Sequence, residues 1–224
     1  MNDDIHRPGF RRTARLLLAL FIVGLTVFLG VGLRTIRRAQ RLRNDICNLE
    51  LGKSTFADVG RLFPQYEGYI SSHDNTPPSC SPEGCSYVMF VENPIPKAVH
   101  IGPQIAFFAK VRISNNVLRE RYLCIGQLKR TQSFEIFVQQ SLDSKFQEDT
   151  RIVSESMMPR KGVQVSPDDS AQFVRLANRL NQGCLVFLGW CSQPKDMLPY
   201  LGDARTKNAA PSPAGTVVWL TEFM

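Results

Sequence analysis

An uninterrupted apolar run, Leu16 to Leu33, most strongly constrains how this 224-residue chain can fold. Its eighteen residues carry no charge. At ~1.5 Å per residue, a helix of that length spans ~27 Å, close to the ~30 Å hydrocarbon core of a bilayer. The sequence therefore predicts a transmembrane helix over 16–33, and the helix can continue to residue 43. Because the run is longer than a ~7–15-residue signal-peptide core and no small-x-small cleavage site follows, we expect a retained signal-anchor.

The excess positive charge of the chain lies entirely around this run. Residues 1–43 hold nine arginines and two aspartates, so this segment has a net charge of +7, the same as the whole chain. Residues 44–224 therefore hold 18 basic and 18 acidic side chains. A neutral remainder lacks the basic excess that neutralises phosphates, so we expect no nucleic-acid partner. The expected partner is the lipid bilayer, through Leu16–Leu33 and the flanking arginines.

The arginines on the two sides of the apolar run are nearly balanced in number, so they do not decide on which side of the membrane residues 44–224 lie. The six cysteines provide separate evidence on this orientation. Cys80 and Cys85 bracket a short loop with Pro and Gly, and Cys184 and Cys191 bracket a second short segment. Both spacings permit disulfides, which favours a periplasmic or extracellular location. Buried thiols are an alternative. Zinc is a weaker alternative, because the second spacing is too long and the three histidines complete no ligand pair.

The pattern beyond the anchor predicts an α+β fold, with one domain built on an antiparallel sheet and two short helices. Residues 46–51 suggest an extended lead-in. Alternating or β-branched stretches indicate strands at 86–92, 105–113, 117–125 and 134–138, with weaker candidates at 152–153 and 162–165. Asn115 and Asn116 tolerate positive φ, so they predict a hairpin turn between the second and third of these strands. Helical periodicity indicates helices at about 55–63 and 167–182. Thr55 and Asp58 approximate a capping box for the first helix, and the second has Ser166 as its expected N-cap and Gly183 as its expected C-cap.

These patterns divide the chain into five parts. A basic tail (1–15) precedes the transmembrane helix (16–33), and a soluble α+β domain follows at 46–202. Residues 203–215 are small, polar and rich in Pro and Ala, which is typical of a flexible linker. Residues 216–223 (TVVWLTEF) form either a terminal edge strand or an apolar tail.

Motifs that carry chemistry are weak in this sequence. GKST at 52–55 resembles the end of a phosphate-binding loop, but Cys47 stands where that motif needs Gly, and a turn followed by a capped helix explains it better. His73 lies next to Asp74 in a loop, where adjacent residues rarely form a catalytic pair, and His100 lies in a strand-like segment. A Cys-His pair with Cys124 or Cys47 is an open but weak alternative, and neither G-x-S-x-G nor C-x-x-C occurs. We therefore assign no catalytic residue, no cofactor and no metal ligand.

Two segments carry a resemblance. LELGKSTFADVGRLF, followed by strands and the VRISNNVLRERY hairpin, is similar to small outer-membrane-assembly lipoproteins and β-lactamase-inhibitor-like domains, although the lipidated Cys is missing. CSPEGC, that hairpin and the late Cys184/Cys191 element with KDMLP resemble uncharacterised single-pass bacterial envelope proteins. The resemblance implies an envelope location and a related fold, and it carries over no site residues.

Together these observations predict a single-pass membrane-anchored protein whose domain has a non-catalytic binding or structural role and faces the periplasm or exterior. An envelope protein is a candidate partner. The alternative is a hydrolase-like envelope enzyme whose site is assembled only in the fold.

Overall fold

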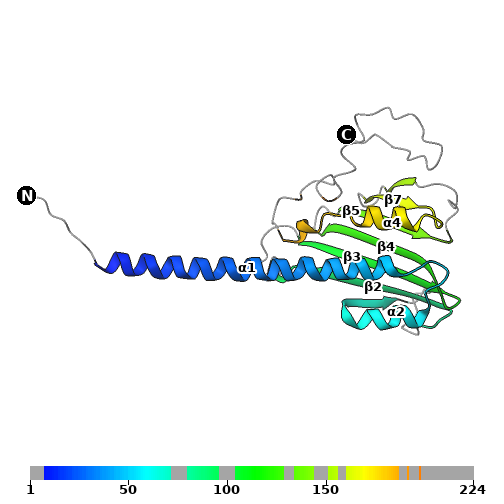
Figure 1. Cartoon of the computed structure of the whole chain (residues 1–224), viewed down its shortest axis with the longest axis horizontal. Coiled ribbons are helices and arrows are strands. Elements are labelled where there is room, and N and C mark those ends of the chain that lie inside the picture. Colours follow the sequence, from blue (N-terminus) through cyan, green and yellow to red (C-terminus); the bar gives the residue numbers. More distant parts are fainter. Residues whose placement is uncertain are drawn as a thin grey trace, which may run out of the picture.

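A long helix, α1 (Pro8–Asn48), projects from one side of a seven-stranded sheet and crosses one of its faces (Figure 1). The computed structural model describes residues 8–71, 80–95, 104–128, 134–143, 151–155, 160–186, 191 and 197. The predicted α+β class is confirmed. The predicted linker (203–215) and terminal segment (216–223) lie outside the described residues.

Helix α1 has two parts with opposite environments. Most side chains between Leu16 and Leu33 are exposed, and this part of the helix is long and apolar enough to cross a membrane. Further along, Ala39, Leu42 and Ile46 are fully buried, and their spacing of three and four residues places them on one helix face. The extended lead-in predicted at 46–51 is therefore wrong at its start, because Ile46 completes this buried stripe and the helix runs to Asn48.

The sheet has the order β1-β2-β3-β4-β5-β7-β6. Its strands are β1 (Glu67–Ser71), β2 (Gly84–Glu92), β3 (Gln104–Ser114), β4 (Val117–Leu128), β5 (Phe134–Ser141), β6 (Arg151–Glu155) and β7 (Arg160–Val165). All six strands indicated by the sequence are present, and β1 is an addition. The predicted hairpin turn is confirmed, since Asn115 and Asn116 both have positive φ (52° and 61°).

The sheet is mostly antiparallel, as the sequence predicts, and one strand pair differs. Strands β5 and β7 are parallel, whereas the other neighbouring strands are antiparallel. The chain first forms the edge strand β6 and then returns through β7, which enters between β5 and β6. A strand inserted in this way runs in the direction of β5, so the order of pairing rather than the strand sequences sets the parallel contact.

The short helices complete the core on the side of α1. Helix α2 (Phe56–Leu62) continues into the 3-10 helix η1 (Phe63–Gln65), and the predicted capping box between Thr55 and Asp58 is present. The Thr55 backbone N–H donates to Asp58 Oδ2 (2.8 Å), and this hydrogen bond is the largest of the contacts that lower the pKa of Asp58.

The second predicted helix is shorter than expected. Helix α4 covers Ser170–Ala177, and its N-cap is Asp169, which accepts a hydrogen bond from Gln172 N (2.8 Å). Ser166 is not the cap, because the helix begins four residues later, at Ser170. The backbone carbonyl of Ser166 accepts a hydrogen bond from Gln140 Nε2 in the sheet (2.6 Å). Gly183 is not a C-cap either, since it lies inside the 3-10 helix η2 (Gln182–Leu185).

Candidate functional site

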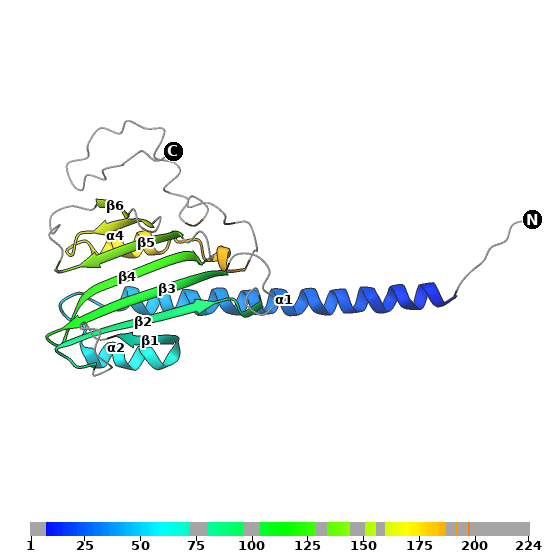
Figure 2. The ribbon, with the colours of Figure 1, turned by 180° about the vertical axis from the view of Figure 1, so that it is seen from behind.

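The face of the sheet that α1 does not cover is the candidate functional site (Figure 2). Along β2 to β5, alternate side chains point away from the buried core, and several of them are aromatic. They line a groove of about 470 Å³. Its lining residues are Tyr69, Val88, Phe108, Lys110, Glu120, Tyr122, Cys124, Glu135, Phe137 and Gln139. We call this feature the sheet groove.

Aromatic rings form the floor of the sheet groove and extend beyond it. Tyr122 of β4 stacks on Phe137 of β5, with ring centroids 5.1 Å apart and an interplanar angle of 27°. Phe108 of β3 lies against Phe90 of β2 with centroids 6.3 Å apart. Tyr69 on the edge strand β1 is 59% exposed. Apolar ring faces on a solvent-accessible surface provide area that a ligand or partner can bury.

Charged and amide groups surround these rings. Glu120 is held on both carboxylate oxygens, since Arg112 Nε lies 3.1 Å from Oε2 and Gln139 Nε2 donates to Oε1 (2.7 Å). The Tyr122 hydroxyl donates to Glu135 Oε2 (3.4 Å), and Lys110 is exposed. The groove therefore offers ring faces for stacking together with fixed donors and acceptors of both charge signs.

A buried arginine lies behind this face, on the core side of β4. Arg121 is 1% exposed. Its Nη1 donates to the carbonyls of Cys47 (3.0 Å) and Leu49 (2.6 Å), where α1 ends. Its Nε (2.8 Å) and Nη2 (2.6 Å) donate to Gln140 Oε1, and the guanidinium lies 4.1 Å from the centre of the Phe173 ring. One side chain thus joins the end of α1 to the sheet and to α4.

Burial lowers the pKa of Arg121 to about 10, so the side chain stays charged at neutral pH. No carboxylate hydrogen-bonds to it in the described part of the chain, and backbone and amide oxygens take that role. Gln140 passes the connection on, because its Nε2 donates to the carbonyls of Ser166 (2.6 Å) and Pro167 (3.0 Å) before α4. The sequence does not reveal the role of Arg121, since an arginine inside the strand VLRERYLCI is typical of a solvent-facing position.

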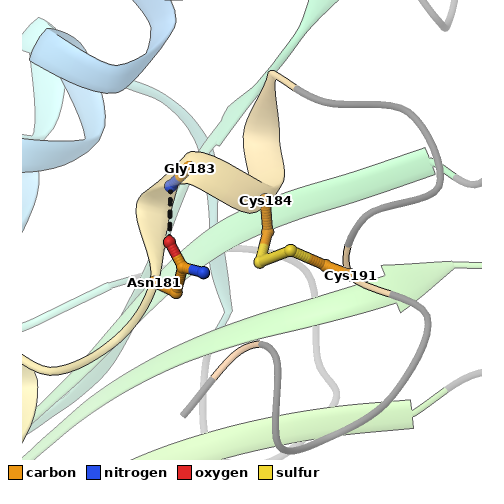
Figure 3. Close-up of a disulfide and its surroundings, with 4 residues drawn as sticks. All are labelled: Asn181, Gly183, Cys184 and Cys191. Carbon is orange, nitrogen blue, oxygen red and sulfur yellow. Dashed lines mark hydrogen bonds between the residues drawn. A yellow bond between two sulfur atoms is a disulfide. The ribbon is translucent and has the colours of Figure 1, made fainter. Parts of the chain in front are cut away.

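The two predicted cysteine pairs lie at disulfide distance. Their Cα atoms are 5.0 Å apart for Cys80–Cys85 and 5.4 Å apart for Cys184–Cys191. The second disulfide links Cys184 of η2 to Cys191. At the start of η2, Asn181 Oδ1 accepts a hydrogen bond from Gly183 N at 3.1 Å (Figure 3).

The two remaining cysteines carry thiols. Burial raises the pKa of the Cys47 thiol, and Cys124 is buried where it borders the sheet groove. Within the described ranges, no three His, Cys, Asp or Glu side chains are arranged to hold a metal ion. His73 and His100 lie outside these ranges.

Comparison with known proteins gives no relative: no protein-family model matches the chain, and neither a curated protein nor a solved structure is significantly similar to it. The resemblance to small envelope domains therefore stays a prediction from the sequence.

Proposed function

We propose that this protein is a single-pass membrane-anchored binding domain that faces the periplasm or exterior and acts without catalysis. The observation that carries the proposal is the division of α1. Its first part exposes leucines and other apolar side chains, and exposing so large an apolar surface to water is unfavourable. Its last part belongs to the domain core. An apolar N-terminal helix of this kind is compatible with a membrane anchor.

The outward orientation is supported by the cysteines. Two cysteine pairs at bonding distance within one domain are typical of proteins that fold in an oxidising compartment. The hydrolase alternative depends on His73 or His100, and it stays a prediction from the sequence.

Labelling of an introduced thiol tests the orientation. Lys53→Cys places a thiol at a position that is 79% exposed, just after α1. We expect a membrane-impermeant maleimide to label this variant on intact spheroplasts, whereas Asn2→Cys, before the anchor, should react only after lysis. The unsubstituted chain measures the background from Cys47 and Cys124. Labelling of Lys53→Cys only after lysis would contradict the outward orientation.

The sheet groove is the surface that we propose for contact with an envelope protein. Its aromatic floor suits apolar side chains of a partner, and Lys110 and Glu135 at its border suit polar groups of either charge. The anchor keeps the groove close to the membrane, which limits its partners to proteins that reach the same surface.

Neighbouring residues on β1 provide a matched test of the groove. Tyr69 lines it, whereas the next residue, Ile70, points to the other face of the sheet and is 37% exposed. A photo-crosslinking residue at 69 should give a discrete adduct in intact cells, and the same residue at 70 should not. Lys110→Glu should reduce the adduct from position 69 several-fold. Equal adducts from both positions, or none from 69, would contradict a role of the groove.

A further inference from the structure

Four arginines follow the apolar run on one face of α1. Arg34, Arg37, Arg38 and Arg41 are spaced by three, one and three residues. At ~100° per residue, they share an arc of about 100° around the helix axis. All four side chains are exposed. We call this set the arginine face.

The arginine face lies to one side of the contact between α1 and the folded domain. The buried stripe of α1 is centred roughly 120° around the helix axis from the centre of the arginine face. This stripe includes Thr35, Ala39 and Leu42. In the described part of the chain, the one carboxylate that pairs with the arginine face is Glu67, 3.6 Å from Arg38, and both side chains remain about half exposed. A net positive charge of about +3 therefore stays unneutralised on this side of the helix, where the apolar run ends.

The arginine face borders a groove on the surface of α1. About 430 Å³ of space lies among the four arginines, Leu33 and Gly30. Gly30 is one turn before Arg34, and a Cβ added to it would have no atom within 4 Å. The end of the groove at Gly30 is therefore open and apolar, and the end toward Arg41 carries guanidinium groups. Along α1 the groove is first apolar and then lined by guanidinium groups. This order matches that of the acyl chain, the glycerol and the phosphate in a phospholipid.

The domain does not cover this groove, because it meets α1 on the other side. Gly32 lies against Val186 of the domain so closely that an added Cβ would be 2.6 Å from Val186 Cγ1. The contact begins inside the apolar run itself. The arginine face consequently sits at the height where lipid headgroups would surround a helix anchored through Leu16–Leu33.

We propose that the arginine face and Gly30 form a binding site for the headgroup of an anionic phospholipid. The proposal rests on the membrane anchor described above. Guanidinium groups bind phosphate oxygens with paired hydrogen bonds. An anionic headgroup is favoured over a zwitterionic one, since the choline of the latter would bring a cation toward four arginines. Each basic residue near an anionic lipid surface contributes about fivefold in affinity.

Native mass spectrometry of the full chain in detergent tests this site. The probes are phosphatidylglycerol and phosphatidylcholine of matched acyl chains. We expect the chain to bind phosphatidylglycerol at least tenfold more tightly. Arg34→Gln/Arg37→Gln/Arg41→Gln should abolish the preference, and Arg61→Gln/Arg119→Gln/Arg175→Gln, with the same change of charge on the domain, should keep it. Gly30→Leu should reduce phosphatidylglycerol binding several-fold with every charge in place.

Each contrary outcome is distinct. No lipid preference in the unsubstituted chain, or an equal loss in both triple variants, would overturn the site in favour of diffuse electrostatic attraction. Displacement of bound lipid by glycerol phosphate at equal concentration would assign the groove to a soluble phosphate compound and also overturn the proposal. Failure of the anchor would show separately, as a full chain that does not float with phosphatidylcholine vesicles.

Discussion

Replacing Arg121 with methionine is expected to lower the free energy of unfolding of the detergent-solubilised full chain by about 3–5 kcal/mol. Methionine fills much of the space but donates nothing. The carbonyls of Cys47 and Leu49 and the Oε1 of Gln140 would then lose the donors that satisfy them inside the core. Urea unfolding followed by circular dichroism measures the change.

Two variants separate this network from charge alone. Arg121→Lys keeps the positive charge, but one ammonium group cannot reproduce the planar set of donors that joins α1 to Gln140, so we expect most of the loss to remain. Arg119→Met alters a neighbouring arginine of β4 whose nearest carboxylate, Asp143, is 3.8 Å away at the surface, and its cost should stay below about 1 kcal/mol. Equal effects at positions 119 and 121 would contradict a special role for Arg121.

Placing two arginines inside the apolar run should release the protein from the membrane. Phe21 and Leu25 lie near the middle of the run and are exposed. Arginine costs about 2.5–3.5 kcal/mol per position at the centre of a membrane helix, so Phe21→Arg/Leu25→Arg should disfavour insertion by about 5–7 kcal/mol. We expect the variant in the soluble fraction after carbonate extraction, where the unsubstituted chain stays with the membrane pellet.

The matched control adds the same two charges farther along α1. Gln40 and Asn44 are exposed and have the same spacing of four residues, and Gln40→Arg/Asn44→Arg should stay in the pellet. The domain contacts α1 from Gly32 onward, and its core uses Ala39, Leu42 and Ile46, so substitutions at positions 21 and 25 should leave the unfolding midpoint similar to that of the control. A Phe21→Arg/Leu25→Arg protein that remains in the pellet, folded and monodisperse in detergent, would argue against a transmembrane anchor.

Local patterns were sufficient for much of the fold. Alternating residues identified β2 to β5, Asn115-Asn116 identified the hairpin turn, and Thr55 with Asp58 identified the start of α2. Each of these features depends on residues within a few positions of one another, which is where sequence patterns carry physical information.

Long-range pairing is not readable from local sequence patterns. The parallel pairing of β7 with β5 joins residues that are distant along the chain, and the local pattern of residues 160–165 indicates a strand but not its neighbour. The same holds for Arg121, whose acceptors lie 19 to 74 residues away along the chain. The sheet groove collects side chains from β1 to β5, so its existence follows from the register of the strands and not from a local motif.

Helix α1 passes from the apolar run into the domain core without a break, and this continuity restricts how the domain can move. The fifteen residues from 34 to 48 rise about 22 Å, so a domain anchored through this helix stands within a few nanometres of the bilayer. No flexible linker separates the apolar run from the domain, so the domain cannot move far from the end of the helix. With the proposed membrane anchor, the domain would rotate about the membrane normal and diffuse laterally, while the helix would fix its tilt and its height above the bilayer. Encounters with other molecules would then be confined to two dimensions.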